Sequence, residues 1–386
     1  MLTVCGRHFL TGEARHFILD GRRIQDIQPP TRRDQMIGDE ELWVAPGLID
    51  IQINGYHGYD LCEPDVSVRD VVNMAEELAH AGVTAFCATV TTAAGDTLLA
   101  CLRAIAQACD TDGVARDRIV AIHLEGPYIA SEDGPRGAHP AQHVRQPDWE
   151  EFTRLQVAAG GRIGMITLAP ELDNALDFIT RARQAGVVVA LGHHNASRAQ
   201  IQAAIDAGAQ LSTHLGNGSH AMLPRHDNYL WEQMANDALL ASVIADGHHL
   251  TSAVVKTIYR TKGPARLILI SDAVAAAGLP PGRYRAGETD IEVGADNAIH
   301  LAGTPYLAGS SLELCKAVDN VMAMAGATFG DAIRMASCNP AALFGLGRER
   351  GALSIGARAD LTLFRPVRGG VQLSATIAGG RICYQA

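Results

Sequence analysis

The sequence predicts an α/β fold: a (β/α)8 barrel of the TIM type, flanked by a small β-sandwich that both chain ends form. Eight short apolar runs alternate with helical stretches, which is typical of a parallel barrel with outer helices. Each run ends at a polar or ionisable residue, and both chain ends have the alternating pattern of half-buried strands. The runs are 48–54, 83–92, 119–125, 163–171, 187–193, 211–214, 240–246 and 267–272.

The two chain ends predict the sandwich. Residues 1–45 alternate apolar and polar side chains, and the dipeptide Asp20-Gly21 between apolar stretches indicates a β-hairpin. The same pattern returns near the C-terminus, around glycine-rich turns, in 359–364, 371–373 and 381–384. We therefore expect two sandwich parts on either side of one barrel, with the boundaries 1–45, 46–346 and 347–386.

Helical periodicity marks the segments between the strands. The clearest are 71–79, 175–185 and 199–207. After the last strand, 310–324 supplies the eighth helix, and 331–344 adds another against the sandwich. A barrel of about 250 residues fits within the chain and leaves roughly a hundred for the accessory layer.

Composition narrows the class of protein. The net charge of -10 argues against a nucleic-acid surface, because phosphate binding needs a basic field. The eight cysteines form no CxxC pairs and mostly lie in apolar runs, so we expect them to be reduced. No signal peptide and no apolar segment of about 18 residues is present. We therefore expect a cytoplasmic protein that does not bind a membrane.

Four residues at strand ends point to a hydrolytic metal site. In such barrels the carboxyl ends of the strands carry the chemistry, so Glu125, His193, His214 and Asp272 should converge. A catalytic zinc takes about three nitrogen or oxygen ligands and leaves a position for water. Glu125, His193 and His214 supply that set, although any one of them alone could be structural. Asp272 fits a general base, with a strand-end cap as the alternative.

These residues belong to a wider set of motifs. The motifs are Pro46-Gly47-Leu48-Ile49-Asp50 with Asn54-Gly55, His123-Leu124-Glu125-Gly126-Pro127, Gly137-Ala138-His139, Gly192-His193, Thr213-His214-Leu215, Ile244-Ala245-Asp246-Gly247-His248-His249, Ser271-Asp272-Ala273 and Leu307-Ala308-Gly309-Ser310. By these motifs the chain resembles, over nearly its whole length, the N-acetylglucosamine-6-phosphate deacetylases of the amidohydrolase superfamily. Glu-Gly-Pro after a strand is a fairly specific marker of this family, whereas Thr-His-Leu alone is weak evidence for it. The resemblance implies an amidohydrolase barrel that hydrolyses N-acetylglucosamine 6-phosphate to glucosamine 6-phosphate and acetate.

The resemblance also implies one divalent metal per chain, held by Glu125, His193 and His214. We expect zinc, while iron, manganese and cobalt suit the same ligands. Much of the superfamily binds two metals through a His-x-His and a bridging lysine, but Gln52 and Asn54 stand in place of those histidines. No lysine lies near the end of strand four, because the only lysines are Lys256, Lys262 and Lys316.

By resemblance, Asp272 acts as base and then as acid, and His139 helps the metal to stabilise the oxyanion. Without the resemblance, His139 would be a loop histidine. Arg225 and His249 follow His214 by eleven and thirty-five residues, as the family's phosphate-binding residues do. A surface arginine and a structural His-His pair are the alternatives. Further substrate positions of the family fall on Ala138, Asn217, Gly218 and Leu307.

The resemblance further implies a homodimer in which Arg225 or its loop reaches into the neighbour's pocket. The chain departs from the family in this region. After Thr-His-Leu the family usually has an aromatic residue followed by Asn-Ala-Met, whereas this chain has Gly-Asn-Gly-Ser-His at 216–220. The family's Arg-Glu-Pro-Gly motif is also missing from the following loop, which reads Arg-His-Asp-Asn at 225–228. Two alternatives therefore stay open. One is an amidohydrolase for another N-acyl amino sugar, an N-acyl amino acid or a cyclic amide, which would not need Arg225 and His249 for a phosphate. The other is a non-catalytic barrel scaffold, which would need none of the four strand-end residues.

Overall fold

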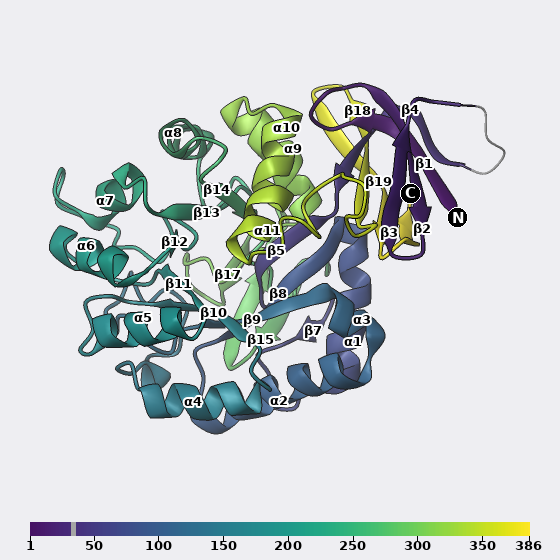
Figure 1. The fold of residues 1–386 in the computed structure, drawn as a ribbon. Coiled ribbons are helices and arrows are strands. Elements are labelled where there is room, and N and C mark those ends of the chain that lie inside the picture. The colour runs from purple at the N-terminus through teal and green to yellow at the C-terminus, as the bar shows by residue number, and fades with distance from the viewer. Residues whose placement is uncertain (32–35) are drawn as a thin grey trace.

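The computed structural model describes residues 1–31 and 36–386, with an eight-stranded parallel barrel sheet as its largest unit (Figure 1). Every strand lies within one of the eight apolar runs, so the predicted barrel is confirmed. The strands are β5 Leu48–Ile53, β8 Val83–Thr91, β9 Ile119–Glu125, β10 Ile163–Leu168, β11 Val188–Leu191, β12 Leu211–Ser212, β13 Leu240–Ile244 and β14 Leu267–Ile270. They follow one another around the sheet in chain order.

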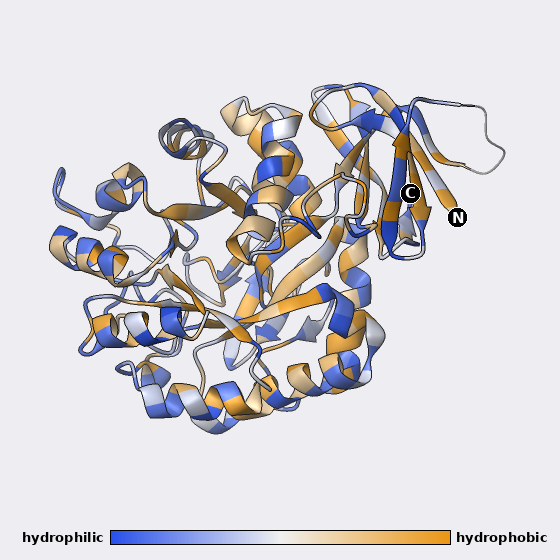
Figure 2. Ribbon diagram, viewed as in Figure 1, coloured by the Kyte–Doolittle hydropathy of each residue, from blue (hydrophilic) through white to orange (hydrophobic). Residues whose placement is uncertain are grey.

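The first and last strands meet just beyond β14. A parallel bridge joins Ile53 to Ala273, and the Asp272 amide donates to the Gln52 carbonyl at 3.0 Å. This contact closes the barrel and brings Asp272 next to the end of β5. All residues of β5, β11 and β14 are buried, as expected for strands covered on both faces. Figure 2 shows the same contrast, with mostly hydrophobic strands inside helices that have one hydrophobic and one hydrophilic side.

The strands of both chain ends pair in one seven-stranded sheet beside the barrel (Figure 1). They are β1 Leu2–His8, β2 Ala14–Asp20, β3 Arg23–Gln28, β4 Met36–Pro46, β18 Leu361–Val367, β19 Gly370–Ala378 and β20 Arg381–Gln385. The order β20-β19-β18-β4-β1-β2-β3 joins the two ends through the antiparallel pair of β18 and β4. The hairpin at Asp20-Gly21 is confirmed by the β2–β3 pairing. The segment boundaries at 45/46 and 346/347 stay a prediction.

Helices cover the barrel, and the predicted ones are found. They are α1 Val68–Glu77, α2 Gly95–Thr111, α3 Gly113–Arg118, α4 Trp149–Ala158, α5 Ala175–Gln184, α6 Arg198–Ala207, α7 Tyr229–Ala235, α8 Ser252–Lys262, α9 Leu314–Ala325, α10 Phe329–Ile333 and α11 Asn339–Leu343. Capping boxes start α1 at Ser67 and α6 at Ser197. A π-helical turn joins α10 to α11, and the ring of Phe329 lies 5.3 Å from Trp43 and 5.4 Å from Phe364. This aromatic contact fastens the last helices to the end sheet.

A small antiparallel sheet, which the residue patterns did not predict, follows the barrel's last strand. It consists of β15 Gly282–Ala286, β16 Thr289–Val293 and β17 Ile299–Leu301. Its apolar side packs on Val274 and Ala308, and Ala138 lies against the same cluster. The Gly287 amide donates to Asp60, the last residue of the short strand pair β6 Gly55–Tyr56 and β7 Tyr59–Asp60. The sheet therefore supports loops near the carboxyl ends of the barrel strands.

Within the described ranges, no helix is long and apolar enough to span a membrane.

Candidate metal centre and surrounding site

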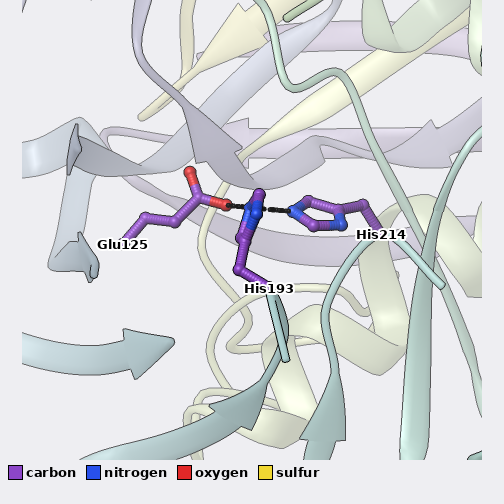
Figure 3. Close-up of side chains that lie close together, drawn as sticks. All are labelled: Glu125, His193 and His214. Carbon is purple, nitrogen blue, oxygen red and sulfur yellow. Dashed lines mark hydrogen bonds and ion pairs between the residues drawn. The ribbon is translucent and has the colours of Figure 1, made fainter. Parts of the chain in front are cut away.

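Three of the predicted residues converge in a buried cluster. Glu125 ends β9, His193 lies two residues after β11, and His214 lies two residues after β12 (Figure 3). The Glu125 Oε1 atom is 3.3 Å from His193 Nε2 and 3.0 Å from His214 Nε2, and the two Nε2 atoms are 3.0 Å apart. In the described part of the chain, this is the one group of three such side chains within metal-binding reach.

The protonation of His193 suits a metal ligand. Its Nδ1 atom lies 2.8 Å from the Pro135 carbonyl oxygen, which can only accept, so Nδ1 carries the proton. The Nε2 atom therefore presents a lone pair to Glu125 and His214, the arrangement that orients a metal-binding imidazole. Electron-rich atoms that converge away from water need a proton or a cation among them. Two imidazole nitrogens and one carboxylate oxygen are the ligands of a catalytic zinc site, so the residues fit a divalent cation.

Glu125 is prepared as an anionic ligand. Burial alone would raise the pKa of this carboxyl, but the neighbouring imidazoles of His193 and His214 hold its pKa well below the usual range. The Nδ1 atom of His214 is buried and, among the residues described, has no hydrogen-bond partner. The cluster therefore combines one ionised carboxylate with two imidazoles whose Nε2 atoms face it.

Asp272 lies beside this cluster, held by two amide side chains. Gln52 Nε2 and Asn54 Nδ2 each donate to Asp272 Oδ1 at 3.1 Å. The same Gln52 nitrogen donates to Glu125 Oε1 at 2.8 Å, and the side-chain oxygen of Gln52 accepts a hydrogen bond from the Thr213 hydroxyl. Burial, and then the negative charge of Glu125, raise the pKa of Asp272 to about 7. A carboxyl with this pKa can both accept and return a proton near neutral pH.

The backbone at three of these residues is unusual. His193, His214 and Asp272 have φ angles of 53°, 30° and 52°, in the left-handed region that side chains other than glycine rarely adopt. Such conformations cost of order 1–3 kcal/mol each and persist where the surroundings impose them, often at functional sites. Each residue lies two positions after the last residue of its strand, so the turn directs the side chain toward the other residues of the site.

His139 lies at the edge of the cluster, on the loop after β9. Its ring is edge-on to that of His193, with centroids 4.3 Å apart, and its Nδ1 atom is 2.8 Å from the Thr92 hydroxyl. Arg136 donates to the His139 carbonyl oxygen at 2.8 Å and so fixes the loop. Burial, and then the charge of His193, lower the pKa of His139 to about 3. His139 is therefore a neutral imidazole near neutral pH.

The predicted substrate residues fall into two groups. His249 is near the cluster, because its charge is one of those that lower the pKa of Asp272, and its Nδ1 atom lies 2.7 Å from Asp246 Oδ2. Asn217 donates to the His214 carbonyl at 3.2 Å. A Cβ atom on Gly218 would lie 2.8 Å from His193 Nδ1, so a glycine is needed there.

The remaining three are less closely tied to the cluster. Ala138 precedes His139 and is half-buried against the small sheet, and Leu307 is half-buried in a bridge to His300. Arg225 is exposed, and its side chain makes no hydrogen bond or ion pair with any residue that the structure describes. The structure of the single chain therefore does not bring Arg225 to the other residues.

Sequence reasoning missed three polar residues around the site. Gln52 was noted only as a replacement for a histidine, although its amide joins Glu125 to Asp272. Asp246 was part of a family motif but was assigned no role in the site. Thr92 was noted only as the last residue of an apolar run. Their positions near strand ends were the available signal. Gln52 and Thr92 contact residues distant in the sequence, whereas Asp246 contacts His249, three residues further on.

Comparison with known proteins agrees with this geometry. The Amidohydrolase family model matches residues 43–383. N-acetylglucosamine-6-phosphate deacetylase from Bos taurus is 32% identical over 95% of this chain and 90% of its own length. N-acetylgalactosamine-6-phosphate deacetylase from Escherichia coli O157:H7 is 34% identical over 84% of this chain and 83% of its own.

Solved structures agree as well. An aspartate-to-alanine mutant of N-acetyl-D-glucosamine-6-phosphate deacetylase from Mycobacterium smegmatis, in complex with N-acetyl-D-glucosamine-6-phosphate, has a TM-score of 0.89 at 30% identity and covers 100% of this chain and 99% of that one. The Thermotoga maritima enzyme has a TM-score of 0.85 at 26% identity, with the same coverage. This chain belongs to the amidohydrolase family, in its N-acetylglucosamine-6-phosphate deacetylase branch.

Proposed function

We propose that this chain is a metal-dependent deacetylase that hydrolyses N-acetylglucosamine 6-phosphate to glucosamine 6-phosphate and acetate. The observation that carries the proposal is the buried convergence of Glu125, His193 and His214 beside Asp272. A scaffold protein would have no use for ligand atoms gathered in this way, because burying them without a cation costs free energy. The relatives in the same branch act on acetylated amino-sugar phosphates, as their names state.

One divalent cation per chain is proposed at Glu125, His193 and His214. Zinc is our first choice, and iron, manganese and cobalt remain candidates because the same ligands hold them. A bound cation would supply a Lewis acid that makes water more acidic and polarises a carbonyl group. The bridge that Gln52 makes between Glu125 and Asp272 supports a single metal, because a neutral amide fills the space between the two carboxylates.

In the proposed reaction, Asp272 takes the proton from the attacking water. Gln52 and Asn54 hold its Oδ1 atom, which leaves Oδ2 to receive the proton. His139 donates a hydrogen bond to the acetamide oxygen as negative charge develops there. Asp272 then returns the proton to the departing amine, so one carboxyl serves as base and acid.

The sugar phosphate is proposed to bind His249 and Arg225, with Ala138, Asn217, Gly218 and Leu307 around the sugar. Imidazolium and guanidinium groups give charge-assisted hydrogen bonds to phosphate. Because Arg225 is exposed, we propose a homodimer in which it reaches the partner's pocket. Met222 and Trp231 support this, since these large side chains of the same region are 89% and 50% exposed.

A second candidate substrate is another N-acyl amino sugar phosphate. The altered loop at 216–231 and the similarity to an N-acetylgalactosamine-6-phosphate deacetylase favour it. An N-acyl amino acid or a cyclic amide fits less well, because neither needs the imidazole that Asp246 orients at His249. A cytoplasmic location is proposed as well, and it is supported by the eight cysteines, all of which are free thiols.

The proposal is tested by acetate release from the zinc-loaded enzyme. We would compare N-acetylglucosamine 6-phosphate with N-acetylgalactosamine 6-phosphate and with unphosphorylated N-acetylglucosamine, using Asp272→Asn as the control for contaminating activity. We expect turnover of the first sugar to exceed that of the other two. Preference for the galactose epimer would select the second candidate. No turnover of any of the three sugars would overturn the proposed substrate class.

A further inference from the structure

Thr92 follows β8 directly and lies in the wall of the site, where only 3% of its surface is exposed. Its Oγ1 atom is 2.8 Å from His139 Nδ1 and 3.5 Å from the main-chain oxygen of Glu125. Gly126 makes room for this hydroxyl, because a Cβ atom at that position would lie 2.2 Å from it. The strand end, the glycine and the His139 loop therefore meet at one hydroxyl group.

A hydroxyl group has one proton, which allows two arrangements. In the first, Thr92 donates to Nδ1, and the proton of a neutral His139 is on Nε2. In the second, Nδ1 carries the proton and donates to Thr92, whose own proton then points to the Glu125 oxygen. The contact to His139 has normal hydrogen-bond length, whereas 3.5 Å to Glu125 lies at the limit for a hydrogen bond. The distances favour the first arrangement.

The two arrangements differ in what Nε2 offers a substrate. In the first, Nε2 is a donor and can stabilise negative charge on an oxygen atom. In the second, Nε2 presents a lone pair that repels such charge. Across the described chain, Nε2 of His139 has no hydrogen-bond partner, so it is available to a ligand. The edge-on contact with His193 and the Arg136 bond to the His139 carbonyl limit rotation of the ring.

We propose that Thr92 is a positioning residue: its hydroxyl donates to Nδ1 of His139, so that the ring proton lies on Nε2 and faces the substrate carbonyl. The catalytic part of this inference rests on the proposed function, whereas the position of the proton does not. Of the two groups that the Thr92 hydroxyl contacts, the His139 ring and the main-chain oxygen of Glu125, only the ring can reach the substrate, so the effect of Thr92 must pass through His139.

The kinetic test uses Thr92→Val, which keeps the shape and removes the donor, and Thr92→Ser, which restores it. For the zinc enzyme we expect Thr92→Val to lower kcat by about tenfold or more. This loss should be smaller than the roughly 10²–10³-fold loss that follows removal of a whole oxyanion donor, and KM should stay within about threefold of the wild-type value. Thr92→Ser should recover kcat to within about threefold. Thr91→Val is the matched control, because Thr91 is the preceding residue and its hydroxyl contacts Cys62 instead.

A double-mutant cycle asks whether the effect passes through His139. In a His139→Ala background, Thr92→Val should change kcat by less than about twofold. A full additional loss would show a structural effect and overturn the proposal, as would an unchanged kcat for Thr92→Val alone.

The direct measurement is the nitrogen NMR spectrum of ¹⁵N-histidine-labelled zinc protein, with the His139 signals assigned by their loss in His139→Ala. We expect Nδ1 to be of the unprotonated type and Nε2 of the protonated type in the wild type and in Thr92→Ser. A protonated Nδ1 would overturn the proposal even if Thr92→Val did not fold. Because this spectrum needs no substrate, it also separates failure of this inference from failure of the proposed function.

Discussion

Replacing Asp272 by asparagine removes one ionisable group from the site while changing its shape very little. Gln52 and Asn54 each donate a hydrogen bond to the Oδ1 atom of Asp272, at 3.1 Å. The carbonyl oxygen of an asparagine can accept both bonds, so the side chain should keep its position. Since Asp272 is outside the Glu125, His193 and His214 cluster, the metal content should also be unchanged.

The expected loss of activity follows from the two proton transfers proposed for Asp272. General acid–base catalysis contributes about 10²–10⁴-fold, and one carboxyl is proposed to perform both steps. We therefore expect Asp272→Asn to lower kcat by about 10³–10⁴-fold, or about 4–5 kcal/mol of activation free energy. KM should change by less than about threefold, because the residue contributes to proton transfer more than to binding.

The same substitution should stabilise the metal-free protein at high pH. Burial, and then Glu125, raise the pKa of Asp272 to about 7 in the fold, whereas aspartate in an unfolded chain has a pKa of about 3.9. A raised folded pKa contributes stability that is present at low pH and lost as the pH rises through about 7. At pH 8 the ionised wild-type residue therefore weakens the fold, and an asparagine does not.

The upper limit of this effect is about 4 kcal/mol, because each tenfold change in proton affinity is worth about 1.4 kcal/mol. We expect about 1–2 kcal/mol, since the side chain keeps some contact with water. Urea unfolding of metal-free protein at pH 8 and pH 5 measures it, with exposed Asp65→Asn as the control. The advantage of Asp272→Asn should shrink at pH 5. The reasoning is refuted if the variant keeps more than a tenth of wild-type kcat, or if it is less stable at pH 8.

Three further predictions follow from individual contacts. Gln52→Leu removes the amide between two carboxylates and should destabilise the metal-free protein at pH 8 by about 2–4 kcal/mol in urea unfolding. Gln202→Leu, at an exposed glutamine, is the control, and equal stability of the Gln52 variant and the wild type would show that the bridge is unimportant. His214→Ala should reduce zinc affinity by more than about a hundredfold in calorimetric titration, and near-normal affinity would exclude it as a ligand. His249→Ala should raise KM for the phosphorylated sugar by about tenfold to a hundredfold with little change for the unphosphorylated one, whereas the exposed neighbour His248 should tolerate the same change.

The barrel was predictable because its signal is local. Each strand buries both faces, so it stands out as an apolar run, and its polar endpoint marks the side of the barrel where chemistry occurs. The run 187–193 shows the limit of this approach. Its strand ends at Leu191, and His193 lies in a left-handed turn that no pattern of residue types reveals.

Contacts across the barrel were not predictable in the same way. Gln52 bonds to residues 73, 161 and 220 positions away, so its role depends on closure of the whole barrel. The small sheet at 282–301 was missed because its strands are short and only partly buried. Arg225 was assigned by resemblance, from its spacing to His214 in the family pattern. Because Arg225 is exposed, its proposed phosphate role requires an assembly with a second chain.

The measurement that tests the central claim most directly is a zinc titration of metal-free protein, followed by acetate release from N-acetylglucosamine 6-phosphate. With the Glu125, His193 and His214 cluster as the one metal site, activity should rise from near zero in proportion to added zinc and level off at one equivalent per chain. Activity without any metal, or a break at two equivalents, would contradict the single catalytic cation. Binding of one zinc without acetate release would retain the metal site and contradict the proposed substrate.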